Sequence, residues 1–395
     1  MAVSRKLPTR RDEGCQKDDM KRFKILARER FQGDGMAVNR KDFTLFEEGK
    51  ESDARLLTDP SLSLYCLDLS RREAVFVSLP PNSDLEAAPF YYEAQFAHAL
   101  NAFTIDFDTF LSLSAPIPQP NKLILVHNIG RCGSTLLSRA FAQLDSCVSY
   151  SEPDCFTQIG HWRTVDDPRD SLWKSILTAC MKFVFLDPIR LQPEVAIVKF
   201  RSGCVNLLDL FTELFPDAKH LFLYRDCSSW VASCLNIAER RGLEHTQLRD
   251  EALQFFRYFT GRAMEQSTFP YDRLGESLRP AERFTVCWLV SMEHVLRFHQ
   301  AFPGLLFPVT YQELATSGEA CLQRIFDYCE LPRERLRDGV VSLTKDSQAG
   351  TKFAREDGTS GNKRQLTDEE IVQSRAILAL HPSINDFRLI LPDSP

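Results

Sequence analysis

Short apolar runs alternate with longer amphipathic segments between residues 123 and 238, and this feature restricts the possible folds more than any other. Each run is short enough for one buried strand, and each is followed by a segment with helical spacing. Such alternation is typical of a parallel sheet covered on both faces. The sequence therefore predicts an α/β fold with strands at 123–127, 147–150, 195–199 and 220–224 and helices at 134–144, near 170–185, 205–215 and 228–238.

The same pattern resumes in the C-terminal third of the chain. A helix is expected at 282–300, a strand at 305–311 and a helix at 317–329. Between the two α/β stretches, residues 240–280 are polar with interspersed aromatics, which indicates partial helicity but no definite role. Residues 346–364 are rich in Gly, Ser, Lys and Arg and predict a loop.

The N-terminal part has weaker signals. Residues 1 to about 55 are charged and predict irregular structure, with the first 25 or so mobile. Residues 62–79 contain two β-type runs around a polar turn, which predicts a hairpin. Pro89 then opens a predicted helix, because proline is favoured in a first helical turn.

A proline-rich segment supplies the best candidate for a domain boundary. Residues 115–121 hold three prolines in five residues, which discourages both a helix and a central strand. We therefore expect a tail with a small α+β appendage at 1–115, and a large parallel-sheet domain at 116–395.

Composition narrows the class of protein. The 48 basic residues against 54 acidic ones give a formal charge of −6, so the overall charge does not indicate nucleic-acid binding. The twelve cysteines include no CxxC pair, which argues against a zinc or redox motif and favours reduced core thiols. No signal peptide or apolar run of 18 residues is seen, so neither secretion nor a membrane span is indicated. A cytoplasmic protein is expected.

Residues 128–135 join the first strand of the α/β region directly to a helix. In such a turn, successive backbone N–H groups and the helix N-terminus can bind phosphate or sulfate oxygens. Glycines let the backbone approach the anion, an arginine adds a fixed charge, and paired hydroxyls add donors. The residues concerned are Gly130, Arg131, Gly133, Ser134 and Thr135.

Two other interpretations of this turn remain open. The Walker A pattern requires a lysine before the hydroxyl residue, whereas Gly133 precedes Ser134, which weakens a kinase or NTPase reading. A glycine-containing turn can also serve only to reverse the chain. Cys132 lies at the helix N-terminus, where thiolate formation is favoured, so covalent catalysis is a further alternative.

A second anchor follows the strand within residues 215–226. Arg225 ends this strand and Ser233 follows eight residues later. Ligands of parallel sheets bind at the carboxyl ends of the strands, so Arg225 is expected to hold a second phosphate near the first loop. The alternative is an ion pair with Asp226 or Asp217. Asp226 itself is expected to cap the following helix.

Together, the two anchors resemble the sulfotransferase family, whose donor is 3′-phosphoadenosine 5′-phosphosulfate (PAPS). The family's R/K-x-G-[ST]-[ST] turn is matched at 131–135, and its F-P-x-A-K strand ending in Arg, with Ser eight residues on, is matched at 215–233. The resemblance covers roughly residues 120 to 330 and implies a P-loop NTPase-like fold. It implies donor contacts from Arg131, Cys132, Gly133, Ser134, Thr135, Arg225, Ser233 and Tyr311.

Further segments resemble particular branches of the family. Ser151-Glu152-Pro153 resembles the segment in which the tyrosylprotein and carbohydrate branches carry a Glu that serves as the catalytic base. Lys199 closes a strand as a family lysine does. Trp288 and Tyr311-Gln312-Glu313-Leu314 resemble the later Trp helix and the Y-E-D-L segment. Two features depart from the cytosolic branch: Arg131 replaces a Lys, and residues 358–363 only loosely match its C-terminal K-G-x-x-G-x-W-K segment.

The resemblance implies roles for three catalytic candidates. Arg131 and Lys199 would stabilise charge on the transferring group, and Glu152 would accept the acceptor's proton. We expect Glu152 on a strand adjacent to the loop strand. Alternatively, Glu152 is a surface carboxylate paired with an arginine, Lys199 extends to water, and His161 is the base.

The leading hypothesis is thus a sulfotransferase that moves a sulfonate from PAPS to a hydroxyl or amine of a small molecule or peptide, with no metal expected. A P-loop kinase or nucleotide hydrolase and an inactive nucleotide-binding protein of the same fold are the alternatives. Nothing in the sequence identifies the acceptor or the oligomeric state.

Overall fold

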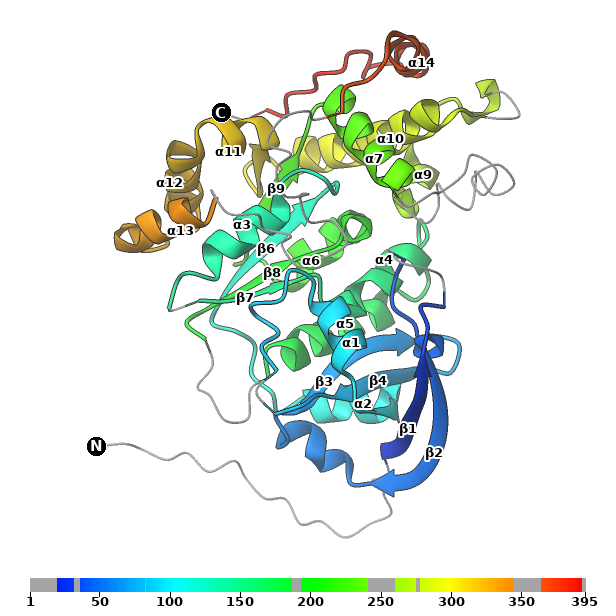
Figure 1. Cartoon of the computed structure of the whole chain (residues 1–395), viewed down its shortest axis with the longest axis vertical. Coiled ribbons are helices and arrows are strands. Elements are labelled where there is room, and N and C mark those ends of the chain that lie inside the picture. Colours follow the sequence, from blue (N-terminus) through cyan, green and yellow to red (C-terminus); the bar gives the residue numbers. More distant parts are fainter. Residues whose placement is uncertain are drawn as a thin grey trace.

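The chain forms two sheets that lie at different heights of an elongated molecule (Figure 1). The computed structural model describes residues 20–31, 36–81, 83–145, 147–186, 193–240, 260–274, 278–343 and 364–392. The expectations for most of 346–364, for residues 241–259 and for the first 19 residues lie outside this described part.

The central layer is a five-stranded sheet in which every pair of neighbouring strands is parallel. The loop-bearing strand β6 is central. From it, the chain goes first to the edge strand β7 and returns to β8 on one side, and later forms β9 and β10 on the other side, so the connections diverge at β6. The predicted α/β fold class is therefore confirmed. In spatial order, the strands are β10 (Leu306–Thr310), β9 (Lys219–Tyr224), β6 (Lys122–Asn128), β8 (Val195–Lys199) and β7 (Cys147–Ser151).

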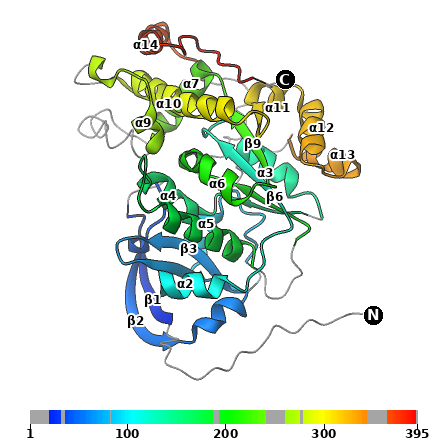
Figure 2. The same ribbon diagram turned by 180° about the vertical axis from the view of Figure 1, so that it is seen from behind.

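Helices cover both faces of this sheet. Apolar side chains of β6, β8 and β9 pack on one face against helices α3, α12 and α13, while the other face packs against α5 and α6, and near β9 against α7, α10 and α14. Figure 2 shows α12 and α13 together beside α3, away from the α7 and α10 pair. The helices are α3 (Ser134–Phe141), α5 (Asp170–Val184), α6 (Leu208–Leu214), α7 (Cys227–Arg240), α9 (Arg262–Gln266), α10 (Pro280–Ala301), α11 (Tyr311–Thr316), α12 (Gly318–Tyr328), α13 (Leu336–Leu343) and α14 (Asp368–Leu378).

The second sheet is antiparallel and precedes the parallel sheet in sequence. The predicted hairpin at 62–79 forms its strands β3 and β4, and the helix expected after Pro89 begins at Tyr91. The expectation of irregular structure up to residue 55 is wrong, because two strands lie there. In spatial order, the strands are β2 (Phe43–Glu51), β1 (Met20–Arg28), β5 (Asn101–Asp106), β4 (Glu73–Ser78) and β3 (Leu62–Asp68), with helices α1 (Tyr91–His98) and α2 (Phe107–Ser114).

The charged composition of β1 and β2 explains why the sequence pattern did not predict these two strands. Only Met20 and Phe23 of β1 are buried, so the strand has no clean alternation of apolar and polar residues. Its pairing with β2 also contains two register shifts. These strands are stabilised mainly by their neighbours, which local sequence patterns do not report.

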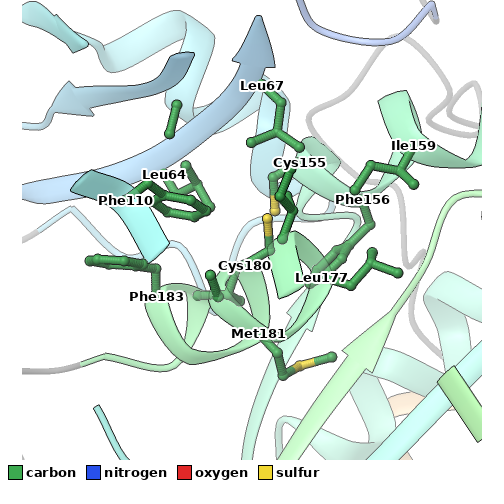
Figure 3. Close-up of a cluster of buried hydrophobic side chains, with 14 of the residues drawn as sticks. Leu64, Leu67, Phe110, Cys155, Phe156, Ile159, Leu177, Cys180, Met181 and Phe183 are labelled. Carbon is green, nitrogen blue, oxygen red and sulfur yellow. The ribbon is translucent and has the colours of Figure 1, made fainter. Parts of the chain in front are cut away.

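The two sheets share one hydrophobic core (Figure 3). Leu64 of β3 and Phe110 of α2 meet Leu177 and Phe183 of α5, and the rings of Phe110 and Phe183 stack with centroids 5.0 Å apart. Phe156, in the short 3-10 helix η3 (Asp154–Phe156), completes the contact. The antiparallel sheet therefore packs directly against the α/β layer, and the boundary near 115 stays a prediction.

Candidate active site

The candidate residues gather at the carboxyl edge of the parallel sheet. Register places Ser151 beside Lys199, Lys199 beside Val126 and Asn128 beside Leu223, so the strand ends are level. Thr310 pairs with Tyr224 at the same edge. Because each strand ends here, the residues at or after its end can reach a common ligand. They are Glu152 after β7, Lys199 at the end of β8, the loop 129–133 after β6, Arg225 after β9 and Tyr311 after β10.

The candidate phosphate loop, residues 129–133 after β6, has a tightly folded backbone. Gly130, Arg131 and Gly133 have φ angles of 75°, 53° and 82°, all in the left-handed region. Asn128 fixes the start of the turn: its side-chain amide donates to the Phe200 carbonyl at 2.7 Å and its Oδ1 accepts from the Gly130 N–H at 2.8 Å. The loop is thus tied to the end of the Lys199 strand. Asn128 two residues before a glycine is a local turn signal that the sequence reading did not use.

Gly133 has a packing requirement as well as a conformational one. A Cβ at this position would lie 3.0 Å from Cδ2 of Tyr311 and 3.3 Å from Leu314. Tyr311 therefore covers the loop where helix α3 begins. The hydroxyl-bearing residues Ser134 and Thr135 are buried in the first turn of that helix.

Arg131 contacts Arg225 and Ser233, although both lie about 100 residues further along the chain. Nε of Arg131 donates to Oγ of Ser233 at 3.2 Å, and Nη1 of Arg225 donates to the Arg131 carbonyl at 3.4 Å. Burial lowers the pKa of the Arg131 guanidinium, and the positive charge of Arg225 lowers it as well. Burial and like-charge repulsion both destabilise a cation, and a bound anion would relieve both. This environment fits a phosphate or sulfate group.

The Arg225 side chain is held from several directions. Its Nε donates to Oγ of Ser229 at 2.7 Å, and its guanidinium carbon lies 4.5 Å from the centroid of the Tyr311 ring. Trp288 donates from its indole nitrogen to the Arg225 carbonyl at 2.9 Å. Asp226 accepts the Ser229 N–H at 2.9 Å in the first turn of α7, which is the helix-capping contact expected for it. The predicted Trp288, Tyr311 and Arg225 segments are thus neighbours.

Trp230 is a site residue that the sequence reading missed. Its indole N–H donates to the Gly130 carbonyl at 2.9 Å, which fixes the phosphate loop to helix α7. Nothing local in the sequence distinguishes this Trp from an ordinary core residue.

Glu152 and Lys199 form an ion pair beside the loop. Nζ of Lys199 contacts Oε1 of Glu152, and the Glu152 N–H donates to the Lys199 carbonyl at 2.7 Å. The side chains are only 2% and 13% exposed, so Lys199 does not extend to water and Glu152 is not a surface carboxylate. Glu152 has a φ of 63°, an uncommon conformation for a residue with a side chain, which costs roughly 1 kcal/mol and is frequent at functional sites.

The expected position of Glu152 requires one correction. Strand β7 pairs with β8 and is not adjacent to the loop strand β6. Glu152 is therefore one strand further from the loop than predicted, and Lys199 lies between them. The order of strands depends on the crossover connections, which the local sequence does not encode.

A second cation reaches Glu152 from Arg201, two residues after Lys199. Nε of Arg201 lies 3.9 Å from Oε2 of Glu152, and its Nη1 lies 3.0 Å from Oδ2 of the buried Asp154. Burial raises the pKa of Asp154, and the charge of Arg201 opposes that rise. Arg201 and Asp154 were not predicted from the sequence, although they lie two and three residues after strands that end at the site.

The antiparallel sheet contributes to this part of the site. The Met36 carbonyl accepts from Arg201 at 3.1 Å, and the Val38 N–H donates to Oδ2 of Asp154 at 2.6 Å. The guanidinium of Arg201 lies 4.6 Å from the centroid of the Tyr92 ring, and Nζ of Lys199 lies 5.7 Å from that of Phe90. The N-terminal part of the chain therefore builds one wall of the candidate site.

Two alternative roles are not supported by the local environments. Burial raises the pKa of the Cys132 thiol to about 11, so the thiolate expected at a helix N-terminus is disfavoured. Burial lowers the pKa of His161 to about 3, with the charge of Arg201 contributing, so His161 is a weak base. The eleven cysteines of the described residues are free thiols, as predicted, and Cys15 lies outside that part.

Comparisons with known proteins return distant structural similarities. No model of a protein family and no curated protein matches the chain. A sulfotransferase domain from the curacin biosynthetic pathway is 14% identical, with a TM-score of 0.39 over 66% of this chain and 98% of that chain. Sulfotransferase STF9 from Mycobacterium avium is 14% identical, with a TM-score of 0.39 over 69% and 78%. The sulfotransferase domain of the Synechococcus PCC 7002 olefin synthase is 16% identical, with a TM-score of 0.32 over 71% and 92%.

Within the part of the chain that the structure describes, none of the helices combines the length and the apolar character needed to cross a membrane.

Proposed function

We propose that this protein is a sulfotransferase that uses PAPS as donor. One observation carries the proposal. The Arg131 side chain contacts Ser233 and its carbonyl accepts from Arg225, beside a Lys199–Glu152 pair at the same sheet edge. Two cationic anchors suit a nucleotide with phosphates at two positions, and an adjacent Lys and Glu suit group transfer with proton removal.

The donor would contact the nucleotide half of the site. Arg225 and Ser233 would hold the 3′-phosphate, and the N–H groups and hydroxyls from Gly133 to Thr135 would hold the 5′-phosphosulfate. Tyr311 would lie against the nucleotide. When bound, PAPS supplies the sulfonate and a good leaving group.

The residues next to the loop would act on the transfer itself. Glu152 would accept the proton from the acceptor's hydroxyl or amine while the acceptor atom forms its bond to sulfur. The bond between sulfur and the bridging phosphate oxygen breaks, and 3′-phosphoadenosine 5′-phosphate (PAP) leaves. Arg131 and Lys199 would stabilise the charge that accumulates on the transferring group and on the leaving oxygen.

The acceptor and the cellular location are part of the same proposal. A small molecule or a peptide with a hydroxyl or amine group would meet Glu152, and no nucleic acid or metal is required. The free thiols are consistent with a reducing compartment such as the cytoplasm.

An inactive nucleotide-binding protein is the second candidate. The Lys199–Glu152 pair favours it, because each group neutralises the other in the absence of ligand. This candidate predicts nucleotide affinity without turnover, whereas the sulfotransferase proposal predicts both.

The first test is a calorimetric titration with PAP, and with ATP in the presence and absence of Mg²⁺. Metal-independent binding of PAP that Arg225→Ala weakens about 100-fold is expected if Arg225 binds a phosphate by charge-assisted hydrogen bonds. Binding of ATP alone, and only with Mg²⁺, would instead indicate a P-loop kinase or hydrolase. If neither nucleotide binds, the proposal is wrong.

The second test concerns turnover and separates an active enzyme from an inactive binder. Release of PAP from PAPS is followed in the presence of phenols, alcohols and amines as acceptors. Acceptor-dependent release that Glu152→Gln reduces is expected for the sulfotransferase. Nucleotide binding with no release for any acceptor would favour the inactive protein.

A further inference from the structure

Glu152 lies between two cations of different mobility. Nζ of Lys199 contacts its Oε1, and Nε of Arg201 lies 3.9 Å from its Oε2. The three side chains are 2%, 13% and 12% exposed for Lys199, Glu152 and Arg201, so they interact with little screening by water. The Glu152 carboxylate therefore has Lys199 as a close partner and Arg201 as a more distant one.

Arg201 is fixed by contacts on its other sides. It forms an ion pair with Asp154 at 3.0 Å, donates to the Met36 carbonyl at 3.1 Å and stacks near Tyr92. Val38 in turn donates to the same Asp154 oxygen. Because these groups belong to the packed contact between the two sheets, the guanidinium cannot move far toward a ligand.

Lys199 is placed differently. Its backbone pairs in register with Val126, two residues before Asn128, which is the last residue of β6 before the candidate phosphate loop. Its ammonium group ends a flexible four-carbon chain, which can turn from one anion to another. Of the two cations, only Lys199 is both next to the loop and able to change partner.

We propose that Arg201 is a positioning residue that holds Glu152 when the donor's sulfonate draws Lys199 away. This inference rests on the proposed function. Donor binding then frees Oε1 of Glu152 to accept the acceptor's proton, while Arg201 keeps the carboxylate charged and oriented. Without donor, Oε1 is occupied by Lys199, so the base becomes available only after the donor is in place.

The exchange of partners affects nucleotide binding itself. The sulfonate of PAPS must compete with Glu152 for Lys199, whereas PAP has no sulfonate and can compete only through its more distant 5′-phosphate. The ratio of PAPS affinity to PAP affinity therefore reports the strength of the Lys199–Glu152 pair, and it does so without an acceptor.

The test measures this ratio by calorimetry at fixed salt for the wild type, Glu152→Gln, Arg201→Met and Arg201→Lys. Removing the competing charge in Glu152→Gln should raise the ratio about fivefold, the effect of one partly buried ion pair. Arg201→Met should lower the ratio about fivefold. Once Lys199 has moved to the sulfonate, Glu152 would be a buried charge without a compensating cation. Arg201→Lys keeps the charge and should restore most of the wild-type ratio.

The outcomes separate this inference from the function on which it rests. A purely structural role of Arg201 would change the PAP and PAPS affinities together and leave their ratio unaltered. If both nucleotides bind but the ratio is unchanged in Glu152→Gln and Arg201→Met, the partner exchange is wrong and the nucleotide site stands. If the wild type binds neither nucleotide, the proposed function fails and the inference fails with it. Thermal melting of each variant confirms that it is folded.

Discussion

The candidate site has two halves, named here by their proposed roles: the nucleotide half around Arg131 and Arg225, and the base half around Glu152, Lys199 and Arg201. They differ in how their charges are arranged. In the nucleotide half, the guanidinium groups of Arg131 and Arg225 contact a hydroxyl, a backbone carbonyl and the Tyr311 ring, and the two like charges are neighbours. In the base half, Lys199 and Arg201 alternate with Glu152 and Asp154, one cation for each carboxylate.

This difference indicates which half is ready for a ligand. Neighbouring cations with burial are destabilised until an anion arrives, so the nucleotide half gains from binding. The base half is already compensated, and a ligand must first break an ion pair there. The nucleotide half should therefore determine affinity, and the base half should contribute to stability and to the order of events.

The largest expected effect is on stability, from Asp154→Asn in the base half. This variant removes the carboxylate that fixes Arg201 and accepts the Val38 N–H, and breaking a buried pair typically costs about 3 kcal/mol. Chemical denaturation measures the loss of unfolding free energy. PAP affinity should change by less than about twofold, because the nucleotide half is intact.

Asp145→Asn is the matched control for this experiment. Asp145 pairs with Arg335 but its side chain is 88% exposed, so its removal should cost less than about 0.5 kcal/mol. A large fall in PAP affinity in Asp154→Asn would contradict the separation of the two halves.

The second effect is on affinity, from Arg131→Gly in the nucleotide half. Glycine adopts the φ of 53° without strain, so the substitution removes the guanidinium and leaves the loop backbone unchanged. We expect PAP to bind about 30-fold more weakly, as for loss of one charge-assisted contact. Arg333→Ala, which removes a mostly exposed arginine paired with Asp327, should leave the titration unchanged. Equal affinities for wild type and Arg131→Gly would exclude this arginine from the nucleotide site.

The two halves were also unequally predictable from the sequence. The nucleotide half depends on local signals: a strand, a glycine turn and a helix at 128–135, and an arginine at a strand end with a serine on the next helix. The parallel strands were predictable for the same reason, because β8 begins with four consecutive buried apolar residues. Order along the chain is sufficient to place such elements.

The base half depends on contacts between segments that are distant in sequence. Met36 and Val38 reach Arg201 and Asp154 only because the antiparallel sheet packs on the α/β layer, and β1 and β2 lack a clear strand pattern. The separation of Glu152 from the loop by β8 follows from strand order. These features arise from tertiary packing, which a single sequence does not display.

The third effect comes from crowding at Gly133. In Gly133→Ala, an alanine must adopt a φ of 82°, which is strained for a residue with a side chain. Its methyl group also lies 3.0 Å from the Tyr311 ring, so the loop and the ring must separate. We expect a loss of stability of about 2 kcal/mol together with weaker PAP binding, both measured on the same preparation.

Gly304→Ala is a close control, because Gly304 has a φ of 78° but no atom within 4 Å of the added methyl group. It shares the backbone strain of about 1 kcal/mol without the clash, and PAP affinity should not change. If both variants lose stability equally and bind PAP normally, Tyr311 does not cover the loop as described.

The smallest effect concerns pH and the strands beneath the nucleotide half. His127 of β6 and His220 of β9 are buried and stacked, with Nε2 of His127 3.2 Å from Nδ1 of His220. Burial lowers the pKa of His220 to about 4, below its unfolded value of about 6.5. Between these values the unfolded chain binds more protons, so stability is complete above about pH 6.5 and falls as the pH decreases toward 4.

His220→Phe should therefore remove part of the pH dependence while keeping the ring in the core. From about pH 7.5 to about pH 5.5, the wild type should lose about 1 kcal/mol more unfolding free energy than this variant. The control is His98→Phe at an exposed histidine, which should have the slope of the wild type. If His220→Phe keeps the full pH dependence of the wild type's unfolding free energy, the acid sensitivity arises elsewhere. The two halves of the site would then not differ through this buried histidine.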